Sequence, residues 1–231
     1  NVDTDAIAKR GTVWFTNTPA VLTEATADIA MALILMVTRR LAEGERVIRS
    51  QTPWQWGMFY MLGIGIQDRQ LGIVGLGDIG QALARRAKAF GMRIAYANRK
   101  PVDGAVEREL DATFMSQAEL LATSDVVSLN CPYSPATHHL IGAAQLSSMK
   151  PSTFLVNTAR GPIVDEVALI DVLRNRRIAG AGLDVYDREP PPADHPFRNM
   201  DNVTVTPHLG YTTIETLTAF YGDMPEAIAA F

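Results

Sequence analysis

The sequence predicts a doubly wound α/β fold, in which helices cover both faces of a parallel sheet. Two observations predict it. From Asp68 to about Val205, short apolar runs alternate with longer helix-like segments. The runs, such as residues 126–129, are mostly apolar at consecutive positions, which is typical of parallel strands that are buried on both faces. Right-handed crossover connections then determine most of the topology.

The segment before this alternating region predicts a strand followed by a helix. Residues 11–17 are predicted as a short strand. From Thr23, apolar residues recur at helical spacing to about Leu41. The most apolar run, residues 29–37, is much shorter than the roughly 20 residues that span a membrane. It therefore predicts a buried helix rather than a membrane segment.

Residues 51–67 predict an extended arm. The segment is rich in aromatic and methionine side chains, including Trp54, Trp56, Phe59 and Tyr60, but has no clean helical or strand period. An arm of this composition packs against another surface, and two interpretations stay open. It contacts either the core of its own chain or a second subunit.

In the alternating region, the apolar runs predict strands and the segments between them predict helices. The predicted strands are residues 71–75, 93–97, 126–129, 153–157, 179–184 and 203–205. The predicted helices are residues 78–90, 116–122, 143–148 and 166–174. A last helix is predicted over residues 213–231.

Composition excludes several classes of function. Lys and Arg number 21 and Asp and Glu number 25, giving a net charge of −4 without long runs of either sign. Neither nucleic acid nor a membrane surface is therefore expected as the main partner. The single cysteine, Cys131, excludes an intramolecular disulfide and argues against a cysteine-based metal site. A reducing compartment, the cytoplasm, is expected.

A glycine motif lies between the first strand and the first helix of the alternating region. Gly75, Gly77 and Gly80 form the pattern G-x-G-x-x-G. Gly75 permits the tight turn, Gly77 lets the backbone approach a pyrophosphate, and Gly80 lets the helix pack closely on the strand. The helix N-terminus adds N–H groups and the positive end of its dipole. The motif predicts a Rossmann-type domain that binds a dinucleotide.

The end of the second predicted strand indicates which dinucleotide is bound. NAD-binding sheets usually carry Asp or Glu there, to bind the ribose 2′-hydroxyl. This chain has Asn98, Arg99 and Lys100 instead. A guanidinium can bind a 2′-phosphate with two hydrogen bonds, and the lysine adds charge. We therefore predict NADP(H), with NAD(H) as the second option.

Three later segments place Arg160, Glu189 and His208 after predicted strands. Ligands of open α/β sheets bind outside the carboxyl ends of the strands, so these side chains can converge on one crevice. Together they suit hydride transfer at a carbon that bears a hydroxyl group beside a carboxylate. The arginine pairs with the substrate anion, the histidine moves the hydroxyl proton, and the glutamate orients the histidine and stabilises its charged form.

The chain resembles the D-isomer-specific 2-hydroxyacid dehydrogenases, among them glyoxylate/hydroxypyruvate reductases. The resemblance covers essentially its whole length and rests on motifs in the family's order. These are the glycine turn, Asn157-Thr158-Ala159-Arg160-Gly161, Leu183-Asp184-Val185 leading to Glu189-Pro190, and Thr206-Pro207-His208.

The resemblance implies a role for each site residue. Arg160 would bind the substrate carboxylate and keto oxygen, His208 would be the acid/base, and Glu189 would be its partner. Asp184 would hold the nicotinamide amide. Further residues would line the cofactor, namely Asp78, Ile79, Cys131, Pro132, Thr137, Thr158, Ala159, His208 and Gly210. Tyr211 departs from the small residue that the family often has there, and it is expected to reshape the mouth of the pocket.

The resemblance also implies a domain organisation. Residues 1–18 are expected to be the tail of a smaller α/β substrate domain whose main part is absent from the chain. Residues 19–209 form the dinucleotide-binding domain, and residues 210–231 are a helix that returns to the substrate domain. In relatives, the long helix from Thr23 to Leu41 and the arm after it pair two subunits, so a homodimer is expected.

The resulting expectation is an NADP(H)-dependent oxidoreductase of small 2-hydroxy and 2-keto acids, with glyoxylate and hydroxypyruvate as the leading substrates. Glu189 favours this over formate dehydrogenases, which have Gln at the corresponding position. Two alternatives remain: a dinucleotide-sensing scaffold like the corepressors of this fold, and a D-lactate or phosphite-type dehydrogenase. No metal site is expected, because His138, His139 and His195 show no metal-ligand spacing.

Overall fold

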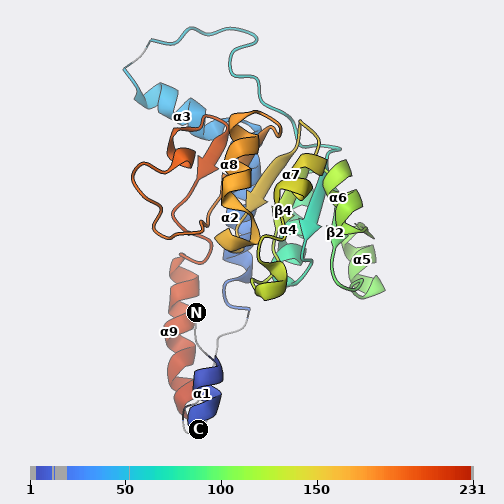
Figure 1. Ribbon diagram of the computed structural model, residues 1–231, viewed down its shortest axis with the longest axis vertical. Helices are drawn as coiled ribbons and strands as arrows, with labels where there is room; N and C mark the ends of the chain where they lie inside the picture. Colours follow the sequence, from blue (N-terminus) through green and yellow to red (C-terminus); the bar gives the residue numbers. More distant parts are fainter. Residues whose placement is uncertain (1–3, 12, 14–19, 52, 230–231) are drawn as a thin grey trace.

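The fold is built on one parallel sheet, seen in the computed structural model, which describes residues 4–11, 13, 20–51 and 53–229. The described residues form seven strands in the order β3-β2-β1-β4-β5-β6-β7 (Figure 1). The strands are β1 (Gln70–Val74), β2 (Arg93–Ala97), β3 (Ala112–Phe114), β4 (Val126–Leu129), β5 (Phe154–Asn157), β6 (Gly180–Leu183) and β7 (Val203–Val205). Every neighbouring pair is parallel, so the predicted doubly wound α/β fold is confirmed.

Helices cover both faces of this sheet. One face packs against α2 (Thr23–Thr38), α4 (Asp78–Ala89) and α5 (Gly104–Leu110) through one core cluster. The other packs against α6 (Gln117–Thr123), α7 (Ala143–Ser148) and α8 (Glu166–Arg174) through a second cluster. The central strands β1, β4, β5 and β6 are buried along their whole length, as continuous apolar runs predict.

The strand order creates a switch point between β1 and β4. The chain runs outward from β1 to β3 and then returns to the other side of β1 to form β4. The helices that follow β1 and β4 therefore cover opposite faces, which leaves a crevice outside the carboxyl ends of these strands. This crevice is where the predicted site residues are expected to meet.

The observed elements follow the predicted ones closely, with three corrections. The helix predicted from Thr23 to about Leu41 ends at Thr38 as α2, and a helix that was not predicted, α3 (Leu41–Arg49), follows after Arg40, whose φ is a left-handed 55°. The sequence analysis assigned no element to α5 or to β3. Of the predicted strand 11–17, only residues 11 and 13 are described, and neither is in a strand; the rest lies outside the described residues.

Two helices project away from the sheet in Figure 1: α1 (Thr4–Arg10) and α9 (Ile214–Ala229). The helix predicted over residues 213–231 matches α9 as far as the structure describes it. In α9, Ile214 and Tyr221 are 81% and 71% exposed, so its first half presents apolar side chains to solvent. Among the helices of the described residues, none has the length and hydropathy needed to cross a bilayer.

The arm lies on the surface of the chain, where it forms the open loop at the top of Figure 1. Its aromatic side chains stay exposed, and Trp56 and Phe59 are 83% and 77% exposed. Trp54 stacks on Tyr60 of the same arm, with ring centroids 6.0 Å apart. For these aromatic residues, the interpretation as ordinary core is therefore wrong.

Candidate active site

A cavity of about 940 Å³ lies at the carboxyl ends of β4, β5, β6 and β7. The predicted residues that line it are Ile79, Cys131, Pro132, Thr158, Ala159, Arg160, Glu189, His208 and Gly210. Residues that the sequence analysis did not select also line it, among them Asn130, Tyr133, Tyr186 and Asp187. The three predicted catalytic side chains therefore line one cavity.

The glycine turn has the geometry that its motif predicts. Gly75 has a φ of +98°, and a Cβ there would lie 2.6 Å from the backbone nitrogen of Cys131. A Cβ on Gly80 would lie 2.4 Å from the Gly75 carbonyl oxygen, so both positions require glycine. A Cβ on Gly77 would instead meet no described atom within 4 Å beyond the two neighbouring residues. Glycine at this position therefore keeps open space in front of the turn.

The turn and its surroundings fit a nicotinamide dinucleotide. Gly77 is the N-cap of α4, and no side chain among the described residues caps this helix, which leaves its N-terminus available to an anion. Two buried polar atoms on the cavity wall, Asn130 Oδ1 and Thr158 Oγ1, have no hydrogen-bond partner in the described part of the chain. Buried polar atoms are normally paired, so these two fit a polar ligand.

Asn98 holds the glycine turn from the end of β2. Its side-chain oxygen accepts a hydrogen bond from the backbone N–H of Leu76, at 2.8 Å. The next two residues, Arg99 and Lys100, are exposed, and neither forms an ion pair within the described ranges. Two unpaired cations therefore stand beside the place where the strand-end carboxylate of an NAD-binding sheet would be.

His208 and Glu189 form a hydrogen-bonded pair on the cavity wall. His208 Nδ1 lies 2.6 Å from Glu189 Oε2, and each side chain is 34% exposed. Glu189 Oε1 accepts a second hydrogen bond, at 3.0 Å, from the backbone N–H of Tyr186. A carboxylate that accepts from Nδ1–H leaves Nε2 as the nitrogen that can exchange a proton with a ligand.

Asp184 holds the loop that carries His208. The residue is fully buried, and its carboxylate accepts hydrogen bonds from the hydroxyl of Thr206 at 2.6 Å and from the N–H groups of Leu209 and Gly210 at 2.7 and 2.8 Å. These bonds fix the backbone on both sides of His208, which itself has a φ of 58°. In this arrangement Asp184 orients the loop and does not line the cavity.

Arg160 follows β5 in a turn that Asn157 holds. The buried Asn157 side chain donates to the Arg160 carbonyl oxygen at 2.9 Å and accepts from the Ala159 N–H at 3.0 Å. A Cβ on Gly161 would lie 2.0 Å from the backbone of Tyr186, so the Arg160 turn and the loop that leads to Glu189 touch. Asn157 and Tyr186 were missed as site residues, although Asn157 stands inside the predicted motif.

Comparison with known proteins supports the family that these motifs suggest. Residues 31–210 match the family model described as D-isomer specific 2-hydroxyacid dehydrogenase, NAD binding domain. The chain belongs to this family. Two similar proteins are glyoxylate reductases, one from Korarchaeum cryptofilum at 44% identity over 100% of the chain and 69% of the relative, and one from Thermococcus litoralis at 46% over 93% and 65%.

Comparison with solved structures also supports this family. The holo form of D-mandelate dehydrogenase from Rhodotorula graminis superimposes with a TM-score of 0.94 at 36% identity, covering 100% of this chain and 68% of that one. The chain thus spans about two thirds of the length of the relatives that it matches. As a 2-hydroxyacid dehydrogenase with a matched NAD-binding domain, the protein uses a nicotinamide dinucleotide.

Two further residues that the sequence analysis singled out, Thr137 and Tyr211, differ in whether they line the cavity. Thr137 does not line the cavity, and its hydroxyl donates to the Pro132 carbonyl oxygen at 2.8 Å. Tyr211 does line it, and its ring stands at 81° to the His208 ring with centroids 6.0 Å apart. The glycine turn, Asp78 and residues 98–100 lie outside this cavity.

Burial raises the pKa of three titratable groups that line the cavity. It raises the pKa of the Cys131 thiol, so this residue is a poor nucleophile at neutral pH. Burial and the nearby Asp184 raise the pKa of Tyr186 to about 12. Burial, then the carboxylate of Glu166, raises the pKa of Asp187. Among the described residues, no three His, Cys, Asp or Glu side chains are placed to hold a metal ion.

Proposed function

We propose that the full-length protein is a dehydrogenase that interconverts small 2-keto and 2-hydroxy acids, and that glyoxylate or hydroxypyruvate is its substrate. The observation that carries this is the hydrogen-bonded pair of His208 and Glu189 on the same cavity wall as Arg160. The two similar proteins named glyoxylate reductase support the choice of substrate.

Each of the three side chains has one chemical role in reduction. Arg160 binds the substrate carboxylate and polarises the carbonyl through charge-assisted hydrogen bonds. Protonated His208 gives the proton at Nε2 to the carbonyl oxygen, as a general acid. Glu189 keeps Nδ1–H oriented and stabilises the positive charge on the imidazole. The dinucleotide, held by the glycine turn and the cavity wall around Thr158 and Ala159, supplies the hydride.

For the cofactor we propose a preference for NADP(H). Arg99 and Lys100 are exposed and unpaired within the described residues, and no carboxylate stands at the end of β2 to repel a 2′-phosphate. The oxygen of Asn98 is engaged by Leu76, which suits a role in holding the turn more than one in binding the ribose 2′-hydroxyl. NAD(H) is the second option.

The test is a turnover assay of the full-length protein with NADPH and with NADH against a panel of 2-keto acids. Our proposal expects the highest kcat/KM with NADPH and with glyoxylate or hydroxypyruvate. Preference for pyruvate, or oxidation of phosphite, would instead support the D-lactate or phosphite-type alternative. Tight dinucleotide binding without turnover, together with capture of peptide partners, would support the corepressor-like scaffold.

We also propose a second domain and a homodimer. Residues 1–18 and 210–231 would belong to a smaller substrate domain, because the chain spans about two thirds of its relatives and α9 exposes Ile214 and Tyr221. The aromatic arm, which exposes Trp56 and Phe59, would pair two subunits. With a single, unpaired cysteine, the cytoplasm is the compartment that we propose.

A further inference from the structure

Two glutamates bind the backbone N–H groups of two consecutive residues beside the cavity. Glu189 Oε1 accepts from Tyr186 N at 3.0 Å, and Glu166 Oε2 accepts from Asp187 N at 3.2 Å. Two consecutive peptide groups, which carry the N–H groups of Tyr186 and Asp187, are therefore held. The turn that starts there leads directly to Glu189.

The other carboxylate oxygen of each glutamate forms a hydrogen bond with a histidine. Glu189 Oε2 lies 2.6 Å from Nδ1 of His208, and Glu166 Oε1 lies 3.0 Å from Nε2 of His195. The second pair is the more buried one, with side chains that are 10% exposed for His195 and 19% exposed for Glu166. Two Glu–His pairs thus bind neighbouring peptide groups. Of the two pairs, only Glu189 and His208 line the cavity.

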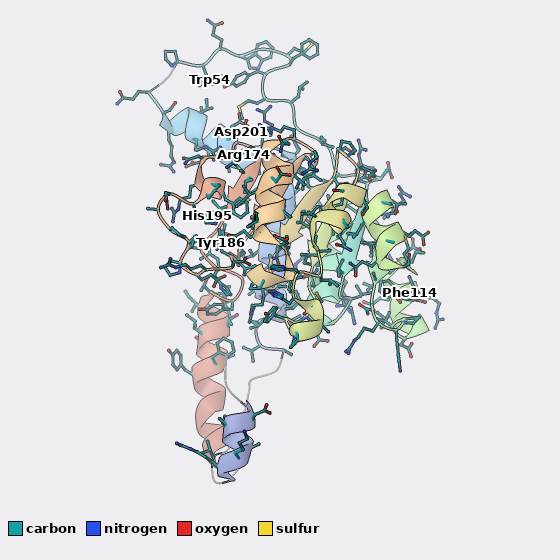
Figure 2. The ribbon with its side chains drawn as sticks, in the orientation of Figure 1. Trp54, Phe114, Arg174, Tyr186, His195 and Asp201 are labelled. Atoms are coloured by element: carbon teal, nitrogen blue, oxygen red, sulfur yellow. The ribbon has the colours of Figure 1, made fainter. Side chains whose placement is uncertain are left out.

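The hydrogen bonds of His195 define its tautomer. Its Nδ1 accepts from the backbone N–H of Phe197 at 3.4 Å, so the proton sits on Nε2 and is donated to Glu166. The ring also packs near Phe197 and Tyr186, with centroids 4.8 and 6.3 Å away, and Figure 2 shows Tyr186 and His195 close together beside α8.

Glu166 connects this turn to a rigid element. It is the first residue of α8, whose N-cap Asp165 accepts a hydrogen bond from Ala168 N. Leu169 and Leu173 bury the same helix against the sheet. A side chain fixed in this way can help to hold the neighbouring loop, because catalytic groups need support from a second layer of hydrogen bonds.

We propose that Glu166 and His195 are positioning residues, which hold the Tyr186–Asp187 turn so that Glu189 meets His208. The proposal rests on the proposed function of His208 and Glu189. Glu166 must be a carboxylate, because two donors approach its two oxygens. A glutamine offers one acceptor oxygen and one donor nitrogen, so it can accept from Asp187 N or from His195 but not from both.

The experiment compares variants of the full-length protein. Glu166→Gln and Glu166→Ala remove the anchor, His195→Leu removes its partner, and His195→Gln keeps a donor toward Glu166. Glu109→Gln is the matched control, since Glu109 is an exposed carboxylate that pairs with Arg85 on α4. The readouts are kcat, KM, the cofactor Kd and the rate of hydrogen exchange at the backbone amide of Tyr186.

We expect Glu166→Ala and His195→Leu to lower kcat about 10- to 100-fold, because small displacements of catalytic groups cost about that much. The cofactor Kd should be unchanged, Tyr186 should exchange faster, and His195→Gln should restore most of kcat. Unchanged exchange at Tyr186 in Glu166→Gln and His195→Leu would overturn the proposal, as would a fall in thermal stability with normal kcat. Because exchange needs no turnover, a wild-type protein without activity would contradict the proposed function alone.

Discussion

His208 Nδ1 lies 2.6 Å from Glu189 Oε2, although the two residues stand 19 positions apart in loops that follow different strands. Two carboxylates that follow β6 in the chain make this contact possible. Glu189 binds the imidazole directly. Buried Asp184 accepts hydrogen bonds from the N–H groups of Leu209 and Gly210, which follow the histidine in the sequence. The loop after β7 is thus attached to the loop after β6, and the imidazole is oriented before any ligand binds.

The first prediction concerns this imidazole. His208→Gln should lower kcat for 2-keto acid reduction by about 10²- to 10⁴-fold, the usual contribution of general acid catalysis. The cofactor Kd should stay as in the wild type, because the glycine turn is untouched. Steady-state kinetics and fluorescence titration measure the two quantities. His138→Gln, at an exposed histidine outside the cavity, is the control and should keep full activity. Normal kcat in His208→Gln would remove this residue from the mechanism.

The second prediction distinguishes the roles of two glycines in the glycine turn. Gly77→Ala should leave the free energy of unfolding nearly unchanged, because beyond the neighbouring residues no described atom lies within 4 Å of the new Cβ. It should abolish tight dinucleotide binding. Gly80→Ala should instead lower stability, since its Cβ would lie 2.4 Å from the Gly75 carbonyl oxygen. Denaturant unfolding and calorimetric titration distinguish the two. Wild-type affinity in Gly77→Ala would mean that the dinucleotide does not cross this turn.

The third prediction concerns the choice between the two dinucleotides. Arg99→Ala should raise KM for NADPH about 10- to 100-fold, because a charge-assisted hydrogen bond contributes roughly 1.5–3 kcal/mol. KM for NADH should not change, because that cofactor has no 2′-phosphate. Arg93→Ala is the control at the other end of β2, and it should affect neither value. Equal effects on both cofactors would contradict the proposed preference.

The fourth prediction links pH to stability through Asp125. Burial alone would raise the pKa of this carboxyl, but hydrogen bonds from Lys150 at 2.7 Å and from Gln70 N at 2.8 Å outweigh it, and the pKa is lowered. A lowered pKa in the folded state means that the stabilisation is present above the unfolded pKa and is lost as pH falls through the folded pKa.

Asp125→Asn should therefore lower the free energy of unfolding at pH 7 by about 1–3 kcal/mol. The difference from the wild type should shrink once pH falls below about 4, the usual value for Asp. Urea unfolding from pH 3 to 7 measures it. Glu119→Gln, at an exposed carboxylate on α6, should show no such trend. A difference that stays constant over this range would show that charge is not its source.

The fifth prediction concerns the arm. Replacing both Trp56 and Phe59 by serine should convert a dimer into a monomer, because these exposed rings supply the apolar contact that we propose between subunits. Light scattering of the full-length protein measures the mass. Phe90→Ser removes an exposed ring outside the arm and should leave the mass unchanged. A dimer that survives the double substitution would place the interface elsewhere.

Local patterns were enough to predict most of the fold. The boundaries of β2, β4, β7, α7 and α8 match their predictions, because each is a distinct apolar run or a helix-length segment between two of them. The strand β3 and the helix α5 were missed because they bury little: β3 buries only Ala112 and α5 only Leu110, so neither shows a continuous apolar pattern. The helix α3 was missed because none of its residues is buried, so it has no apolar face that packs on the core.

The sequence by itself determined the doubly wound sheet, the glycine turn and the choice of Arg160, Glu189 and His208. Residues that follow parallel strands must share one edge of the sheet, so their convergence could be predicted without coordinates. Only the tertiary structure decided how they are held: that Asp184 is buried under the His208 loop, and that Glu166 binds both Asp187 N and His195. These contacts join loops that are distant in sequence, and a hydrogen bond depends on tenths of an ångström that no residue pattern encodes.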